Sequence, residues 1–213
     1  MALFLNSKNT RYGKKPEGFG PRVSFFFRVF IIAGLLLGLL TFAVGAEEEE
    51  YVEQMFLTKK EALKVAFPGV KKVKKKKVWL TDTQTAAIQK ILGDQIKYNE
   101  RRVTHYIGLN DAGQPVGAMT IGNEIGRSYP ITFMVVINPN GTVKDVEIMV
   151  YREPHGWEVR FESFMSQFFG RDGGDPFDNI NNITGATLSV RSMTKGVKKA
   201  VAEFQVIYKD KVQ

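Results

Sequence analysis

An uncharged apolar run near the N-terminus divides the chain and limits what each part can fold into. Arg28 is followed by eighteen residues without a charge, Val29 to Ala46, with five leucines near the centre. No polar face interrupts the run, so it does not have the pattern of an amphipathic surface helix. Six basic residues precede it and Glu47–Glu50 follow directly. The positive-inside bias therefore leaves the N-terminus in the cytoplasm and everything after residue 46 outside.

Two interpretations of this run remain open. The small residues Val44-Gly45-Ala46 suit a signal-peptide cleavage site. The long basic leader, and a run close to the minimum for crossing a bilayer, suit an uncleaved anchor. A buried helix of a soluble protein fits the flanking charges less well. Both leading interpretations predict an extracytoplasmic domain on the periplasmic or cell-surface side.

The run also suggests how the chain is divided. Residues 1–28 form a basic cytoplasmic leader and residues 29–46 the signal peptide or anchor. Residues 47–101 read as a spacer and helical region, and residues 102–213 as the functional domain. About 165 residues after the run are enough for one domain with a real core.

The composition excludes several classes of site. The chain has no cysteine, which rules out disulfides, Cys-ligated zinc, Fe–S clusters and thiol nucleophiles. The two histidines, His105 and His155, have no plausible nucleophile between them, so we predict neither a catalytic array nor a metal site. Of the net charge of +8, residues 1–46 carry +5 as six basic and one acidic residue. The remaining +3 does not indicate nucleic-acid binding.

Alternating apolar residues predict an antiparallel meander between Arg102 and Tyr151. The expected strands are 103–107, 116–121 with a continuation after Gly122, 131–137 and 143–151. Turn sequences separate them at Asn110–Gly113 and Asn138–Gly141. Strands in sequence joined by short turns pair antiparallel. Together with the helices described next, they predict an α+β fold.

Two helices are expected before the meander and two after it. Thr58-Lys-Lys-Glu61 is a capping box that opens a helix to about Phe67, and Thr81 begins a second helix that ends at Gly93. Later, a stripe of Trp157, Phe161, Phe164, Met165 and Phe168 has helical spacing and is typical of core. The last helix is predicted from about Ser189 to Tyr208, with Val190, Met193, Val197, Val201 and Phe204 on one face.

Six lysines at positions 71, 72 and 74–77 form the densest charge cluster in the chain. The simplest interpretation is a solvated linker or the edge of a sheet. The functional alternative is contact with anionic lipid headgroups or with an acidic partner.

The segment between the last two helices carries the strongest candidate site. Thr184-Gly185-Ala186-Thr187 is a turn of small residues that leads into a helix. Gly185 can adopt a positive φ, and Ala186 lets a ligand approach the backbone. Unpaired N–H groups at the helix start suit a phosphate, and Thr187 and Ser189 supply hydroxyls. From the residues alone, an ordinary helix cap and an anion site both remain open.

This segment, with the strands before it, resembles the FMN-binding domain family. That family includes a subunit of the sodium-translocating NADH:quinone reductase, its Rnf-type relatives and many exported single-domain proteins. Its hallmark is Ser/Thr-Gly-Ala-Thr before an amphipathic helix. The second threonine takes FMN as a phosphodiester, attached by a flavin transferase that uses FAD. The resemblance implies this role for Thr187, with Thr184, Gly185 and Ala186 before it and Leu188 and Ser189 after it as cofactor-binding neighbours.

Two further stretches extend the resemblance, and one position departs from it. Val150–Gly156 resembles the family's strand end and glycine-containing turn, which implies that Glu153 lies near the flavin. His155 is either a neighbour of the flavin or an exposed turn residue, and Phe164–Gly170 resembles the Phe-x-x-x-Phe-x-Gly stretch that follows. The family's acidic residue three positions before Thr184 is Asn181 here, so FMN bound without a covalent bond stays an alternative.

The resemblance implies an extracytoplasmic electron-transfer flavoprotein rather than a stand-alone enzyme. Its expected partners are the membrane, a flavin transferase for maturation and redox partner proteins. Two other functions remain open, a self-contained flavin-dependent reductase and a non-redox module that binds a flavin or phosphate ligand or serves the cell envelope.

Overall fold

The computed structural model describes residues 53–209, which lie within one unit that begins at Glu49. The basic leader and the run 29–46 lie outside the described residues, so the export segment stays a prediction. Among the helices in the described part of the chain, none is both long and apolar enough to cross a bilayer.

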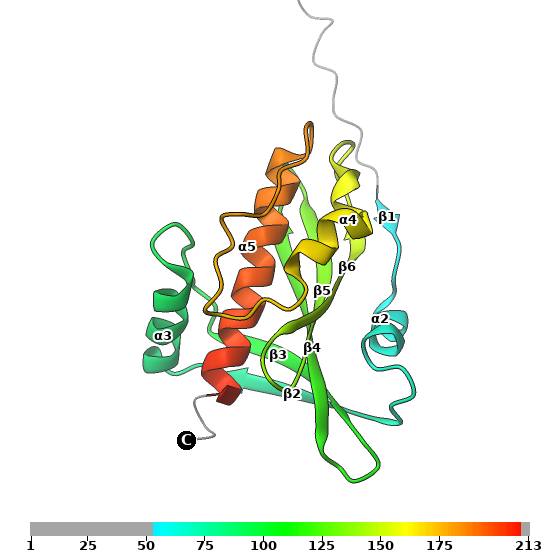
Figure 1. Ribbon diagram of the computed structural model, residues 1–213, viewed down its shortest axis with the longest axis vertical. Helices are drawn as coiled ribbons and strands as arrows, with labels where there is room; N and C mark the ends of the chain where they lie inside the picture. The colour runs from blue at the N-terminus through cyan, green and yellow to red at the C-terminus, as the bar shows by residue number, and fades with distance from the viewer. Residues whose placement is uncertain (1–52, 210–213) are drawn as a thin grey trace, which may run out of the picture. The chain divides into compact units, whose positions relative to one another are not determined.

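Six antiparallel strands form one sheet in the order β1-β6-β5-β4-β3-β2 (Figure 1). The predicted meander is confirmed, because each strand from β3 to β6 pairs with the next. The lysine run is the edge strand β2, and the unpredicted β1 forms the other edge beside β6. The bounds are β1 Gln54–Met55, β2 Lys72–Trp79, β3 Arg102–Leu109, β4 Pro115–Ile125, β5 Pro130–Ile137 and β6 Val143–Tyr151.

Both early helices begin at the capping boxes read from the sequence. Helix α2 (Lys59–Ala66) has Thr58 as its N-cap, and helix α3 (Asp82–Leu92) has Thr81. In each case the threonine hydroxyl accepts a hydrogen bond from the backbone amide of the third helical residue. The side chain of that third residue in turn accepts from the backbone amide of the threonine. Such reciprocal caps satisfy amides that a helix start leaves unpaired.

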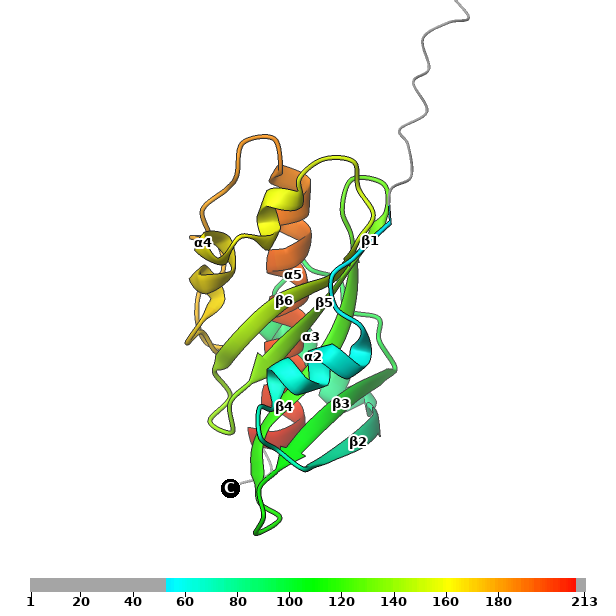
Figure 2. The same cartoon turned by 90° about the vertical axis from the view of Figure 1, so that its right-hand side faces the viewer.

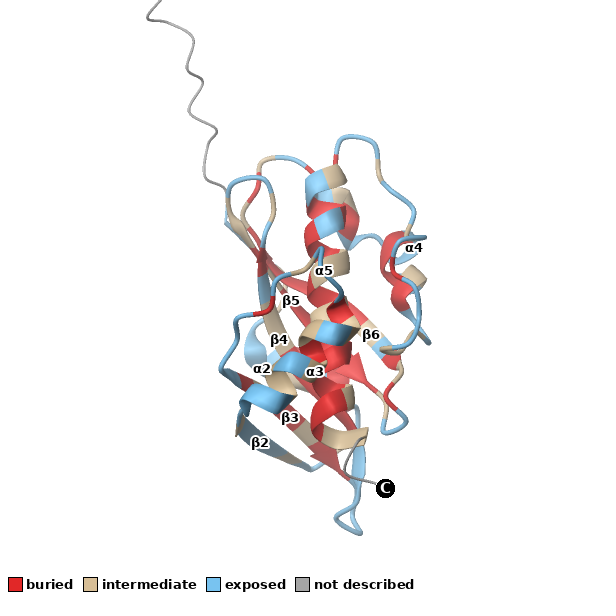
Figure 3. Ribbon diagram, turned by 90° about the vertical axis from the view of Figure 1, so that its left-hand side faces the viewer, coloured by how far each residue is buried: buried red, intermediate tan, exposed pale blue. Residues whose placement is uncertain are grey.

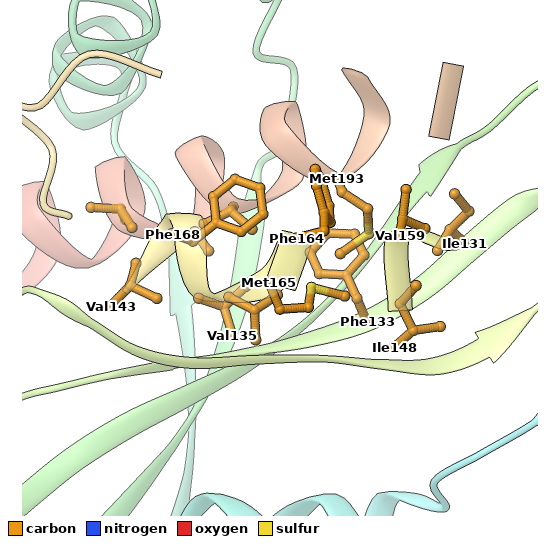
Figure 4. Packing of buried hydrophobic residues seen from close by; sticks show 14 of the residues in the cluster. Ile131, Phe133, Val135, Val143, Ile148, Val159, Phe164, Met165, Phe168 and Met193 are labelled. Carbon is orange, nitrogen blue, oxygen red and sulfur yellow. The ribbon is translucent and has the colours of Figure 1, made fainter. Parts of the chain in front are cut away.

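Helix α5 (Thr187–Phe204) covers one face of the sheet, and the short α2 lies on the other (Figure 2). The α5 residues that face the sheet are buried, as Figure 3 shows in red. Gly196 allows a close approach, since a Cβ there would lie 2.1 Å from the Phe133 ring. Figure 4 shows the resulting core, in which Met193 lies beside Phe133 and Phe164, and Phe164 packs against Phe168. Helix α3 packs beside α5 around Ile88 and Leu92.

The helix expected over the aromatic stripe is broken, which corrects that prediction. The segment contains a 3₁₀ turn at Trp157–Arg160, the short helix α4 (Glu162–Met165) and a second 3₁₀ turn at Ser166–Phe168. The break lies at Phe161, whose ψ of 141° is that of extended backbone and not of a helix. As a result Phe164, Met165 and Phe168 are core, whereas Trp157 and Phe161 lie on the surface.

The last helix also differs at both ends from the prediction. It starts at Thr187 rather than Ser189, and after Phe204 it widens into a π-helical turn over Gln205–Lys209. The predicted inward face of α5 is confirmed, because Val190, Met193, Val197, Val201 and Phe204 are all buried.

A buried carboxyl group joins this helix to the segment after α3. The Tyr98 hydroxyl donates to Glu203 Oε1 at 2.9 Å, and only 8% of Glu203 is exposed. Burial is the main cause that raises the pKa of Glu203 to about 7, and the Tyr98 hydrogen bond opposes this rise. The folded protein therefore holds a proton on Glu203 at pH values where an exposed glutamate has lost it.

His105 is a structural residue on strand β3. It is fully buried, and its Nδ1 lies 3.2 Å from the Tyr208 hydroxyl. Burial lowers its pKa to about 4, with a smaller contribution from Lys76. His105 is thus a neutral core residue, far in sequence from the loops described next.

Candidate functional site

A cavity of about 430 Å³ opens where strand β6 ends and helix α5 begins. Three segments that are distant in sequence form its walls, namely the turn between β4 and β5, the loop after β6 and the start of α5. The lining residues are Arg127, Glu153, Pro154, His155, Gly156, Trp157, Glu158, Gly185, Ala186, Thr187, Leu188 and Ser189. All three segments lie at one end of the sheet, toward the top in Figure 1.

The start of α5 has no side chain capping it. Its N-cap is Ala186, which cannot accept a hydrogen bond through its side chain. Gly185 enters the turn with a φ of 85°, a left-handed conformation that glycine adopts without strain. The first residues of an eighteen-residue helix line the cavity and bring the positive end of the helix dipole to it. This arrangement favours an anion such as a phosphate.

Thr187 lies at the border of two hollows. It lines the cavity and also a wider groove of about 1050 Å³ between α5, the loop after α3 and residues 176–182. Among the described residues, it alone lines both. The Asn182 side-chain amide donates to Thr187 Oγ1 at 3.1 Å. This bond orients the hydroxyl while the threonine stays partly exposed.

The Ser189 hydroxyl is engaged by Tyr151 at the edge of the cavity. The Tyr151 hydroxyl donates to the His155 carbonyl oxygen at 2.6 Å and lies 2.9 Å from Ser189 Oγ. Because the single phenolic hydrogen goes to the carbonyl, Ser189 is the donor in the second bond. Burial raises the pKa of Tyr151 to about 12, so the phenol stays protonated. The Ser189 hydroxyl therefore fixes the loop after β6 to α5.

Gly156 permits this contact between the two elements. It has a φ of 85°, and a Cβ there would lie 2.7 Å from Ser189 Oγ and 2.9 Å from the Tyr151 hydroxyl oxygen. No larger residue fits without moving the loop. The glycine of the Glu-Pro-His-Gly turn is thus required by packing as well as by backbone conformation.

Glu153 ties the turn between β4 and β5 to the end of β6. Its Oε1 accepts from the amides of Ser128 at 2.7 Å and Tyr129 at 2.8 Å. Its Oε2 is buried and has no hydrogen-bond partner within residues 53–209. A buried acceptor without a partner is costly. Since Glu153 lines the cavity, this unpaired acceptor belongs to a residue of the cavity wall.

Two apolar side chains at the cavity are open to solvent. Trp157 and Leu188 are each 45% exposed. The Trp157 and Phe161 rings pack edge to face, with their centres 5.3 Å apart. His155, also at the cavity, is exposed. Exposed apolar surface beside a few fixed polar groups is characteristic of small-molecule sites.

Most of the predicted site residues therefore meet in one place. Seven line the cavity, namely Glu153, His155, Gly185, Ala186, Thr187, Leu188 and Ser189. Thr184 lies just outside, on the exposed part of the turn. The sequence did not indicate Arg127, Tyr151, Glu158 or Asn182. Asn182 could have been found from its proximity to the Thr184–Thr187 motif. Arg127 could not, because it reaches the site only through strand pairing.

The fold and the cavity together define a class of protein. This α+β domain presents an uncapped helix start, a hydroxyl and apolar surface around one hollow, which suits a phosphorylated aromatic ligand. Comparison with protein families makes this specific, because residues 126–202 match the model of the FMN-binding domain. This segment, about a third of the chain and containing the whole cavity, belongs to the FMN-binding domain family, and FMN is its cofactor.

Other comparisons add a structural likeness. The crystal structure of NqrC from Shewanella oneidensis matches with a TM-score of 0.46 and 15% sequence identity, over 67% of this chain and 86% of NqrC. No curated protein matches the sequence.

Proposed function

We propose that this protein is an extracytoplasmic electron-transfer flavoprotein that carries FMN as a phosphodiester on Thr187. The observation that carries this proposal is the position of the Thr187 hydroxyl. It lies in the first turn of an uncapped helix, oriented by Asn182, at the edge of a cavity within the FMN-binding segment. A phosphate on this oxygen lies next to amides that stabilise negative charge.

The remaining lining residues fit the other parts of FMN. Trp157 and Leu188 supply exposed apolar surface for a planar ring. Arg127 brings a positive charge to the cavity, and the unpaired Oε2 of Glu153 accepts from a donor on the ligand. When bound, the flavin supplies one- or two-electron transfer. The protein's own residues hold it, orient it and adjust its surroundings.

The Asn181 departure bears on how the cofactor becomes attached. The Asn181 backbone amide donates to Gln167 Oε1 at 2.7 Å, and the residue is exposed. Asp178, the nearby acid, lines the wider groove instead of the cavity. A flavin transferase that needs a carboxylate at position 181 therefore modifies this chain incompletely, and the unmodified fraction binds FMN through the cavity alone.

The proposed location follows from the apolar run 29–46. Either a retained anchor or a cleaved signal delivers the domain outside the cytoplasm. A covalent bond keeps the cofactor from being lost there. The partners in this proposal are a flavin transferase and redox proteins at the membrane that supply or accept electrons.

Intact mass of the protein after co-expression with a flavin transferase tests this proposal. The expected result is an adduct of one FMN moiety that survives denaturation. A protein that purifies without colour and without added mass, from cells in which a known flavoprotein substrate is modified, contradicts it. Colour lost on denaturation, with no added mass, supports FMN binding but overturns the covalent bond.

A further inference from the structure

Positive charge is concentrated in one short stretch of the described chain. Between Gln54 and Thr81 there are nine lysines and one acid, Glu61. The other described residues include fourteen basic and fifteen acidic side chains. The excess positive charge of residues 53–209 thus comes entirely from α2, β2 and the link between them. The flavin site accounts for none of it.

Strand pairing places part of this charge on the face of the sheet that carries α2. Lys75 pairs with Tyr106, and Tyr106 packs in the apolar cluster beneath α2. Alternate residues of a strand share a face, so Lys77 and Trp79 point to the same side as Lys75. The Lys59 Nζ lies 5.0 Å from the centre of the Tyr106 ring, which brings the helix charge beside the strand charge.

These side chains are exposed and largely without counter-charges. Within residues 53–209, Lys71 alone of the nine lysines forms an ion pair, at 4.0 Å from Asp111 and with both side chains in solvent. Trp79 is 70% exposed, and the Arg102 guanidinium lies 5.3 Å from the centre of its ring. Lysines on an edge strand prevent strand-to-strand aggregation. That role explains neither the lysines of α2 nor a tryptophan left in water.

We propose that this surface binds anionic phospholipid headgroups. We call it the lysine face and define it as Lys59, Lys60, Lys64, Lys75, Lys77 and Trp79. Lysines are attracted to an anionic membrane surface, and tryptophan favours the boundary between headgroups and acyl chains. This inference goes beyond the proposed function. It rests on the proposed delivery by residues 29–46 and is independent of the flavin.

The length of the chain favours a membrane over an acidic protein as the occupant. Six residues, 47–52, separate the end of the apolar run from Glu53. Fully extended, they span roughly 20 Å, and a six-stranded sheet is about 24 Å from edge to edge. While the run is in the bilayer, this short linker keeps the domain close to the same membrane, and β2 contacts the membrane when the sheet lies along its surface. Helix α5 lies on the face of the sheet opposite α2 (Figure 2), and the cavity is lined by the start of α5, so lipid contact leaves the cavity accessible.

Vesicle binding of residues 47–213 tests this inference. The chain from Glu49 onward is one unit with its own apolar clusters, so the run 29–46 can be left out. The chain has two tryptophans, and Trp157→Phe leaves Trp79 as the probe. We expect vesicles of phosphatidylglycerol with brominated acyl chains to quench Trp79 fluorescence in the protein without flavin. We expect phosphatidylcholine vesicles to quench Trp79 fluorescence only slightly, and added salt to release the protein from phosphatidylglycerol vesicles.

Charge reversals distinguish the lysine face from net charge. The pair Lys75→Glu and Lys77→Glu is expected to lower partitioning about tenfold or more, and Lys60→Glu with Lys64→Glu on α2 gives a second test. Lys90→Glu with Lys97→Glu makes the same charge change at exposed sites elsewhere and retains most binding. Three outcomes overturn the inference. They are an equal loss of vesicle binding in all three double variants, no quenching by phosphatidylglycerol vesicles, and charge reversals that abolish binding of an acidic protein but leave vesicle binding unchanged. Flavin attachment is measured separately by in-gel fluorescence, so a failure of the proposed flavin site does not change the result of the vesicle experiment.

Discussion

The Tyr151 hydroxyl joins the loop after β6 to the first turn of α5, because it lies 2.9 Å from Ser189 Oγ while donating to the His155 carbonyl. Residues 38 positions apart in sequence are thereby fixed on either side of the cavity. The shape of the cavity depends on this connection as much as on the residues that line it.

Tyr151→Phe is expected to loosen the cavity without unfolding the protein. It removes two hydrogen bonds, each worth about 0.5–1.5 kcal/mol, and leaves the Ser189 hydroxyl buried without a partner. We expect a lower unfolding midpoint in urea and reduced flavin loading. Tyr208→Phe is the matched control, because its hydroxyl contacts His105 away from the cavity. If both variants load flavin equally well, the Tyr151 connection does not shape the site.

Gly156→Ala is expected to reduce flavin attachment severely. The new methyl group meets Ser189 Oγ at 2.7 Å, in addition to the cost of a positive φ. Gly170→Ala carries the same backbone cost at a φ of 80°, with open space around it. Attachment measured by in-gel fluorescence should therefore fall in the first variant and persist in the second. Similar results for the two would show that packing at Gly156 is unimportant.

Thr187→Ala is expected to abolish flavin fluorescence in denaturing gels, because it removes the proposed attachment oxygen. Stability should change by no more than about 0.5 kcal/mol, since the residue is partly exposed. Thr184→Ala, on the same turn but outside the cavity, is the control and keeps its fluorescence. Signal that persists without Thr187 places the bond on another hydroxyl.

Asn181→Asp is expected to raise the fraction of protein that carries covalent FMN. It restores the carboxylate found in the family pattern at an exposed position whose backbone bond to Gln167 is unaffected. The measure is the ratio of modified to unmodified mass after a fixed time of co-expression. Asn179→Asp adds the same charge two residues away and should leave the ratio unchanged. An unaltered ratio in both variants means that the carboxylate does not limit the reaction.

Glu203→Gln is expected to stabilise the protein at pH 8 more than at pH 5. The folded pKa of about 7 exceeds the ordinary value of 4.5, so the folded state retains a proton that the unfolded chain releases. The contribution of Glu203 is therefore fully present below pH 4.5 and is lost as pH rises through 7, a loss on the order of 3 kcal/mol. Urea unfolding of both proteins across this range measures it. Glu162→Gln, at an exposed site, should keep the wild-type pH profile, and parallel profiles for Glu203→Gln would contradict the assignment.

Local patterns predicted the strands and helix caps well because neighbouring residues determine them. The boxes at Thr58 and Thr81 and the turn at Asn138–Gly141 each contain their own hydrogen-bond partners. The aromatic stripe failed as a helix because spacing alone does not reveal the extended backbone of Phe161. Its first two aromatic residues were then free to face solvent instead of the core.

The candidate site was predictable only in the part that is contiguous in sequence. The segment 184–189 and the turn around Glu153 could be read directly. Arg127 and Tyr151 meet them through pairing between β4, β5 and β6 and through the packing of α5. Such contacts depend on register over the whole sheet, which no single motif encodes.

Strand β1 contributes only Gln54 and Met55, yet these two residues pair with Tyr151 and Val150 along the outer side of β6. They shield the backbone of a strand that would otherwise be a bare edge open to other chains. Loss of these two residues would expose β6 beside the loop that lines the cavity, so this short strand also guards against aggregation.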